Sequence, residues 1–380
     1  MHATHTDAPR TRPEPVPLDQ RDPRRPLLAL YRAPSIDPAR PDATHPTLRL
    51  AGPATRWLRA DSEDRHAALQ TLDPQTGERL DSRADPDPLA SIERVWLESR
   101  ARPTPEGGWL GRLYYRLGAW IEPTAGPTPS GPLFDLLRLD EPSPFAHTPA
   151  PSPASAPAPA PAPETPLAGD MASNPGAEAF QERVRRVLEY LRDGDIFQAN
   201  LAHELRGPFV GDPRRAFATL AEATRPLFGA LIQTPRPTHP SLEPRIESTL
   251  SMSPELFLDY DADSSRVVTR PMKGTRPLGE PGAEADLEHA AKDHAELAMI
   301  TDLMRNDLGR VCAPGTIRVA SDRALERHAE GAPGAILQAT ATVEGRLASR
   351  HGLADLLRAT FPPGSVTGAP KIRAMQIIDE

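Results

Sequence analysis

A run built almost entirely of proline and alanine, from Pro149 to Pro163, constrains the architecture of this 380-residue chain more than any other feature. Proline fixes its own φ and carries no backbone N–H, so the run can form neither a helix nor a sheet ladder. We predict that residues 141–174 form an extended linker or surface insertion, rather than a ligand for a proline-binding module. The chain therefore divides into a part before this stretch and a part after it.

The overall composition narrows the classes of function that this chain can perform. It has 47 prolines and only 5% aromatic residues, which indicates that part of the chain is not packed core. The formal net charge of −8 argues against a general nucleic-acid-binding protein. No stretch of about 18 uninterrupted apolar residues is present, and residues 1–26 contain no apolar run. We therefore expect a cytoplasmic protein with no membrane span and no secretory signal.

The part before the linker begins with a polar, proline- and arginine-rich segment, residues 1–26, which we predict to be a disordered arm. Residues 27–140 are predicted to form the N-terminal part of the fold. Within it, residues 27–31 have the length of a short strand, and the aromatics and glycines of residues 107–122 also favour a strand. For residues 90–98 a helix and a strand fit the pattern equally well.

Residues 175–380 carry the stronger helix and strand patterns. Apolar residues from Phe180 to Leu191 recur at helical spacing, which predicts a helix with a core-facing stripe and a cap at Gly194. Helices are also predicted over residues 283–308 and 353–361 and from Pro370 onward. Strands are predicted over residues 196–201, 228–233, 250–260, 266–270, 317–319 and 335–345, with a proline-rich loop over residues 234–249.

The segment around Lys273 is the first candidate for chemistry. Pro271 fixes its own φ, and Gly274 permits a backbone conformation that other residues avoid and lets a ligand come close. Lys273 is therefore predicted to lie at a tight corner at the end of a strand. A Lys held there can clamp a phosphate or carboxylate, or act as a nucleophile when it is desolvated. A solvated Lys in a surface turn would give the same local pattern.

A loop of small residues over residues 364–371 is the second candidate. Its small residues are Gly364, Ser365, Thr367 and Gly368. They lead into a predicted helix, whose N-terminal N–H groups and dipole favour an anion such as a carboxylate or a single phosphate. Lys371 and Arg373 are expected to add positive charge there. The alternative is a plain capped loop.

Three carboxylates complete the set of candidates. Glu255 follows Ser253 and Pro254 and can act as a general acid at a strand end. Glu296 and Asp302 lie on the predicted long helix, where one or both can hold Mg²⁺. A solvated helix face would also account for the latter two.

Five motifs, in this order, resemble those of the chorismate-utilising enzymes. They are GDIFQANL (residues 194–201), SPE (253–255), PMKGTR (271–276), DLMRNDLGR (302–310) and FPPGSVTGAPKIRAM (361–375). The resemblance covers about residues 177–380, and residues 107–122 resemble the Gly-Gly-Trp segment of the family's N-terminal part. It implies an α+β fold like that of anthranilate synthase component I, with two packed, mostly antiparallel sheets flanked by helices.

The same resemblance implies roles for the candidate residues. Lys273 would attack C2 of chorismate and expel the C4 hydroxyl, with Glu255 as the general acid, and would leave when ammonia adds at C4. Glu296 would bind Mg²⁺, and the metal would hold a chorismate carboxylate. The substrate site would be lined by Gly274, Thr275, Ser365, Thr367 and Gly368.

Two positions favour the aminodeoxychorismate synthase component I branch of this family, in para-aminobenzoate and folate biosynthesis. The hydrating branch has a water-activating Lys where this chain has Gln198, and anthranilate synthases usually have Ala where it has Lys273. Gln338 stands where the family often has His, and its role stays open. The alternatives are an anthranilate synthase component I and a non-catalytic remnant that still binds an amidotransferase.

Two further expectations follow from the resemblance. The single cysteine, Cys312, lacks a glycine-flanked nucleophile turn, so ammonia would come from a separate glutamine amidotransferase subunit. Family members also continue for several strands beyond the position of Glu380, and those strands contribute an Arg and a Glu to the site. We therefore expect residues 175–380 to be an incomplete catalytic domain, and the chain alone to be inactive and poorly stable.

Overall fold

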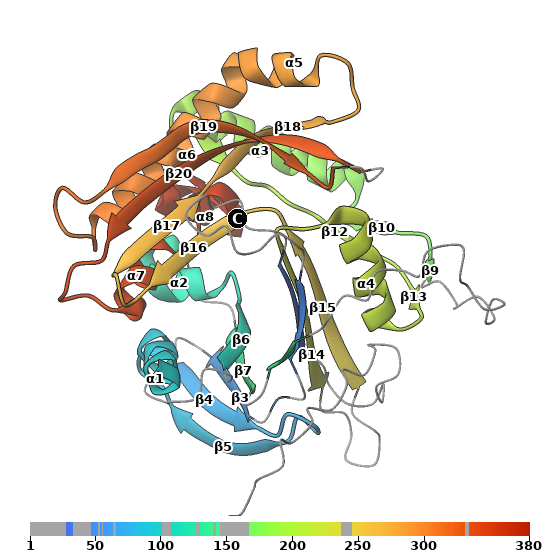
Figure 1. The fold of residues 1–380 in the computed structure, drawn as a ribbon, viewed down its shortest axis with the longest axis vertical. Helices are drawn as coiled ribbons and strands as arrows, with labels where there is room; N and C mark the ends of the chain where they lie inside the picture. Colours follow the sequence, from blue (N-terminus) through green and yellow to red (C-terminus); the bar gives the residue numbers. More distant parts are fainter. Residues whose placement is uncertain are drawn as a thin grey trace, which may run out of the picture.

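The computed structural model describes residues 28–32, 47–51, 54, 56–63, 66–100, 108–126, 130–139, 142–144, 167–236, 245–330 and 334–380. The predicted N-terminal arm and most of the predicted linker lie outside this described part. The described part is α+β, as predicted, with antiparallel sheets flanked by helices (Figure 1). Its strands form three five-stranded sheets and three two-stranded ones.

The N-terminal sheet has the strand order β5-β4-β3-β7-β6. Its elements are β3 (Arg56–Glu63), β4 (His66–Leu72), β5 (Arg79–Ala84), β6 (Gly108–Leu113) and β7 (Gly131–Leu139), with α1 (Pro88–Arg100), α2 (Leu117–Ile121) and the 3-10 helix η2 (Pro123–Ala125). Residues 90–98, for which a helix and a strand fitted the pattern equally well, thus belong to a helix, α1. The strand predicted over residues 107–122 is wrong beyond Leu113, because the chain turns there into α2, where Gly118 packs closely against Pro362.

The central sheet joins residues from both sides of the predicted linker, and the linker prediction is wrong at residues 142–144, which form its edge strand β8. In the order β15-β14-β1-β2-β8 it contains β15 (Arg245–Ser253), β14 (Phe228–Arg236), β1 (Leu28–Arg32), β2 (Thr47–Ala51) and β8 (Pro142–Pro144). Because β1 pairs antiparallel with β14, the two parts of the chain are interwoven in one sheet.

The loop predicted over residues 234–249 is wrong at both ends. The ladder between β14 and β15 continues through the pairs Thr234↔Glu247 and Pro235↔Ile246 and ends at Arg236↔Arg245. Pro235 lies next to the end of this ladder, where the missing N–H of proline is tolerated.

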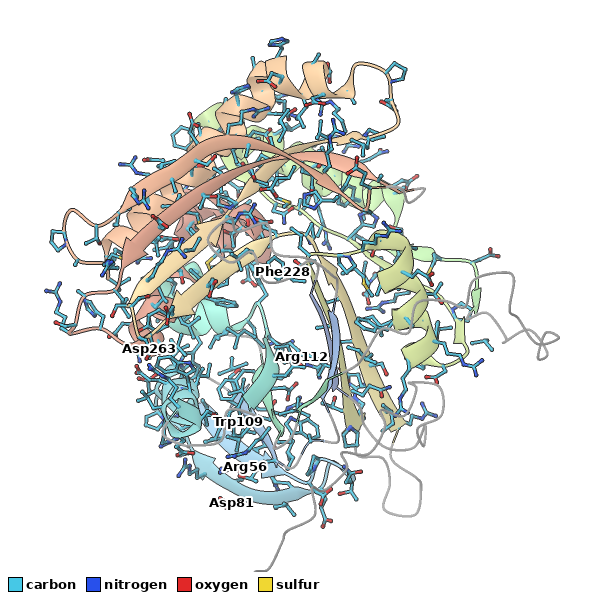
Figure 2. The ribbon with its side chains drawn as sticks, in the orientation of Figure 1. Arg56, Asp81, Trp109, Arg112, Phe228 and Asp263 are labelled. Atoms are coloured by element: carbon cyan, nitrogen blue, oxygen red, sulfur yellow. The ribbon has the colours of Figure 1, made fainter. Side chains whose placement is uncertain are left out.

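Arg112 connects the N-terminal and central sheets. Figure 2 shows this residue on β6, between the two sheets. Its Nε lies 2.9 Å from Oδ2 of the fully buried Asp135, and its NH2 lies 3.3 Å from Oγ1 of Thr234 and 3.4 Å from Oε1 of Glu247. A partly buried, charge-assisted network therefore fixes one sheet against the other.

The C-terminal sheet lies at the opposite end of the molecule from the N-terminal sheet (Figure 1). It has the order β16-β17-β20-β18, with β19 also paired to β20. The strands are β16 (Leu256–Asp261), β17 (Arg266–Arg270), β18 (Met272–Pro277), β19 (Arg318–His328) and β20 (Ile336–Arg346).

Two helices, α5 (Ala283–His289) and α6 (Ala291–Gly309), stand where one long helix was predicted. The helix breaks at Ala290, whose ψ of 93° is extended rather than helical. Further along, α6 packs on β20. Alternate residues of that strand, including Ala341 and Val343, are completely buried toward the helix, where Ile300 and Met304 lie.

The remaining elements surround these sheets. They are β9 (Leu167–Ala168), β10 (Ala172–Asn174), α3 (Ala177–Asp193), β11 (Gln198–Ala199), β12 (Glu204–Arg206), β13 (Phe209–Val210), α4 (Pro213–Thr224), α7 (Leu353–Thr360), η3 (Gly364–Val366), β21 (Gly368–Ala369) and α8 (Lys371–Asp379). The strand predicted over residues 196–201 shrinks to the short β11, which pairs with β21. In the described part, no helix is both long enough and apolar enough to span a bilayer.

The predicted helix α3 forms and ends at Gly194, which adopts the left-handed conformation with φ of 82°. Its apolar stripe, however, does not enter the core. None of its residues is fully buried, and Leu188 is 41% exposed. Only Val187, Tyr190 and Leu191 pack partly against the small cluster around Ile196. The prediction of a core-facing stripe was therefore wrong for the described chain.

Candidate active site

Lys273 lies in a bulged strand rather than at a corner. β17 and β18 run end to end along one edge of β20, and the carbonyl of Pro271 between them accepts a hydrogen bond from the Ala341 N–H at 3.0 Å. Between the pairs Met272↔Thr340 and Thr275↔Gln338, β18 holds one residue more than β20. The predicted tight corner was wrong, because β20 keeps the strand paired past the proline.

Gly274 has the unusual backbone that the sequence predicted, with φ of 86°. The close contact on its side-chain face is with protein rather than ligand. A Cβ there would come within 2.7 Å of Cδ1 of Leu287 and 2.9 Å of Cγ of Asp293. The glycine therefore allows α5 and α6 to pack directly on the bulge that carries Lys273.

Thr275 is exposed, and its Oγ1 accepts a hydrogen bond from Nε2 of Gln338 at 3.2 Å. The other amide atom of this side chain, Gln338 Oε1, is buried and has no hydrogen-bond partner among the described residues. Gln338 thus connects β20 to the predicted substrate-lining Thr275 and leaves one acceptor free.

Glu255 occupies the turn between β15 and β16, where Pro254 interrupts the strand predicted over residues 250–260. Burial raises the pKa of its carboxyl group. A hydrogen bond from the Ser365 side chain, the charge of Lys273 and a hydrogen bond from the Met272 backbone act in the opposite direction. Three residues that were predicted separately, Lys273, Glu255 and Ser365, therefore lie near one another, on β18, the β15–β16 turn and η3.

The environment of Glu255 suits proton donation. Its pKa lies above the usual value of 4.5, with desolvation as the largest cause, so the carboxyl group keeps its proton to higher pH than an exposed glutamate does. It also lies beside an amine that can act as a nucleophile. An acid and a nucleophile that face each other can open a substrate by addition and departure of a leaving group.

The loop over residues 364–371 differs from the predicted anion site. The Thr367 hydroxyl, completely buried, donates to the Pro363 carbonyl at 3.0 Å, and Gly368 lies so close to Gln198 that a Cβ would be 2.1 Å from its carbonyl oxygen. These two residues shape the loop. Ser365 is the residue of the loop that reaches Glu255.

The two basic residues after this loop are already paired, so the expectation that they charge an anion site was wrong. Lys371 points into the core, where its Nζ lies 2.5 Å from Oδ2 of Asp307. Arg373 pairs with Asp195 at 3.0 Å. Helical spacing showed Asp307 to be a polar residue within the apolar stripe of α6, and this signal could have identified the buried pair.

Glu296 stands alone as a candidate metal ligand. Its side chain is 35% exposed, and Oε1 lies 3.6 Å from Nζ of Lys292. Asp302, the other predicted ligand, is 76% exposed and pairs with Arg305. Among the described residues, no group of three or more His, Cys, Asp or Glu side chains could hold a metal ion, so they do not complete a Mg²⁺ site.

Comparisons with known proteins identify the family of this chain. A family model described as chorismate binding enzyme matches residues 58–380. The chain is 41% identical over 208 residues to anthranilate synthase component 1 1 of Haloarcula marismortui, a match that covers 53% of this chain and 39% of that protein. It is 40% identical over 221 residues to aminodeoxychorismate synthase component 1 of Escherichia coli, covering 56% of this chain and 45% of that protein.

A solved structure supports the fold. Anthranilate synthase component I from Streptococcus pneumoniae superposes with a TM-score of 0.63 at 22% identity, over 87% of this chain and 75% of that one. The matches to the two curated relatives span less than half of each relative's length.

Proposed function

The chain belongs to the family of chorismate-binding enzymes, and we propose that it provides the catalytic residues of an aminodeoxychorismate synthase component I. Such an enzyme converts chorismate and ammonia to 4-amino-4-deoxychorismate, a precursor of para-aminobenzoate and folate. The observation that carries the proposal is the meeting of Lys273, Glu255 and Ser365. The relatives include an aminodeoxychorismate synthase component of the same similarity as the anthranilate synthase one.

In the proposed reaction, the neutral amine of Lys273 forms a bond to C2 of chorismate. The C4 hydroxyl leaves as water after it takes the proton of Glu255. Ammonia then adds at C4 while the bond between C2 and the lysine nitrogen breaks, and the resulting ammonium group returns one proton to Glu255. Each bond and proton is thereby accounted for, and both side chains are regenerated.

The proposed steps do not involve Mg²⁺ directly. We propose that Glu296 supplies one carboxylate ligand to the ion, which when bound would neutralise a carboxylate of chorismate. Among the described residues, Glu296 belongs to no group of three or more His, Cys, Asp or Glu side chains that could hold the ion.

Ammonia is proposed to come from a glutamine amidotransferase partner. Cys312 is only 6% exposed and packs in the core beneath α6, and burial raises the pKa of its thiol. A buried cysteine without an activating base is a poor nucleophile for glutamine hydrolysis.

The second candidate is an anthranilate synthase component I, because a relative with that name is 41% identical. Lys273 distinguishes the two, since the proposed displacement at C4 depends on a nucleophile at this position.

The test is product analysis with the purified protein. Incubated with chorismate and ammonium, it is expected to form 4-amino-4-deoxychorismate, and Lys273→Ala is expected to abolish that product. Arg185→Ala, on the exposed face of α3, is the control. Anthranilate as the product would establish the second candidate, and an unchanged rate for Lys273→Ala would refute the covalent route.

A further inference from the structure

Lysine is rare in this chain. It occurs only at positions 273, 292 and 371, whereas Lys and Arg together number 44. Arginine is a larger, planar cation, whereas lysine presents a compact ammonium group. Lys273 is the proposed nucleophile, and Lys292 is 86% exposed beside Glu296. Lys371 is buried and takes no part in the proposed reaction.

The ammonium group of Lys371 joins three helices. Its Nζ donates to Oδ2 of Asp307 at 2.5 Å and to the Thr360 carbonyl at 3.0 Å. Asp307 lies in the last turn of α6, Thr360 ends α7 and Lys371 begins α8. The other carboxylate oxygen of Asp307 accepts from NH2 of Arg310 at 3.1 Å.

These contacts close a loop that contains part of the candidate site. Thr360 and Lys371 flank the loop over residues 361–370. The hydrogen bond between them therefore fixes the distance between the two ends of this loop. Asp307 then fixes these ends to α6. Higher in the loop, Gly364 packs on Leu303 of the same helix so closely that a Cβ would come within 2.3 Å of Cδ2. Ser365, the next residue, lies close enough to Glu255 for its side chain to lower the pKa of that carboxyl group.

We propose that Lys371 is a positioning residue: it joins the two ends of the 361–370 loop, ties them to Asp307, and so holds Ser365 within hydrogen-bonding reach of Glu255. The inference rests on the proposed function only insofar as Glu255 is the acid of the reaction. In this role Lys371 maintains the geometry of the site and does not contact an anionic group of the substrate.

The chemistry of the buried pair explains why neither partner is freely replaceable. Burial lowers the pKa of Lys371 and raises the pKa of Asp307, and each is returned toward its charged form by the other. Arg310 and Glu122 also face the pair with opposite effects on the ammonium group. A neutral side chain at position 371 would leave the buried Asp307 with its ion pair to Arg310 but without the one to Lys371.

The test uses the full-length protein and a variant that removes both charges, Lys371→Met with Asp307→Leu. Replacing both members of a buried pair with apolar residues preserves packing, whereas removing one leaves an unpaired charge. We expect kcat for chorismate to fall about 10- to 100-fold, because the loop is misplaced, with a smaller change in KM. We also expect the basic limb of the pH profile to move to higher pH.

Ser365→Ala is the reference for this shift. The Ser365 hydrogen bond lowers the pKa of Glu255, so its loss raises that pKa and keeps the acid protonated to higher pH. If Lys371 acts through Ser365, adding Ser365→Ala to the double variant produces no further shift. A wild-type pH profile in the double variant, or shifts that simply add, would overturn the proposal.

A second readout separates this inference from the proposed function. Carbon-13 NMR of the Glu255 carboxyl group, assigned with Glu255→Gln, follows its titration without any turnover. A raised pKa in the double variant supports the positioning role even when no 4-amino product forms, and an unchanged pKa refutes it. If the double variant does not fold, Lys371→Arg is measured in the same way, because the larger cation disturbs the same loop.

Discussion

The carboxyl group of Glu255, the proposed acid, lies in an environment that favours its protonated form. Burial raises its pKa, while Ser365, Lys273 and the Met272 backbone together only partly offset that effect. Ionisation of Glu255 therefore lowers the stability of the folded state relative to the unfolded state.

The pH dependence of stability follows from this. Because the folded-state pKa of Glu255 lies above its unfolded value of about 4.5, the folded state binds more protons between these two values. The contribution of Glu255 is therefore fully present below pH 4.5 and is lost as the pH rises through the raised pKa. Glu255→Gln should gain stability relative to wild type as the pH increases, measured by urea unfolding from about pH 4 to about pH 8. Glu178→Gln on exposed α3 is the surface control, and a difference between Glu255→Gln and wild type that does not vary with pH would contradict the account.

Gly274 gives a second prediction at the scale of one residue. Gly274→Ala should destabilise the protein by about 1–3 kcal/mol, because alanine is strained at a positive φ and its Cβ would meet Leu287. Gly279→Ala, where no atom lies within 4 Å of an added Cβ, should change the free energy of unfolding far less. Equal effects of the two substitutions in urea unfolding would show that the bulge does not need a glycine.

At the scale of elements, α6 packs on β20, and this packing supports the bulged strand β18, which pairs with β20 and carries Lys273. Ile300 is completely buried against Val267 and Val343, so truncation leaves a cavity in the middle of this contact. Ile300→Ala should therefore cost about 2–5 kcal/mol of unfolding free energy. The matched truncation Leu188→Ala, at a position 41% exposed on α3, should cost less than about 1 kcal/mol. Similar values for both would mean that α6 is not the packed centre of this sheet.

The elements also show where sequence patterns reach their limit. Apolar periodicity predicted the locations of α3, α6 and β20, because side-chain spacing alone determines which face is apolar. It did not predict that the stripe of α3 stays partly exposed, since burial depends on what packs against the helix. The prolines near the end of β14 led to the prediction of a loop, although residues 234–236 pair with β15.

At the scale of the whole molecule, the order of the motifs predicted which residues would meet. Lys273, Glu255 and Ser365 are 18 or more residues apart in sequence, and the resemblance to a known family implies that they belong to one site. The burial of Lys371 was not predicted, because its partner Asp307 is 64 residues away and the polar position of Asp307 within the apolar stripe of α6 was not taken into account. The interweaving of the two parts of the chain in the central sheet likewise depends on long-range pairing.

The covalent step of the proposed reaction is tested most directly by mass spectrometry of the peptide that contains Lys273. The full-length protein is incubated with chorismate in the absence of ammonia, then digested. The account predicts an adduct on Lys273 with the mass of chorismate less one water, absent from Lys273→Ala and discharged to 4-amino-4-deoxychorismate when ammonium is added. Formation of the 4-amino product with no adduct on Lys273, at the same rate in Lys273→Ala, would contradict it.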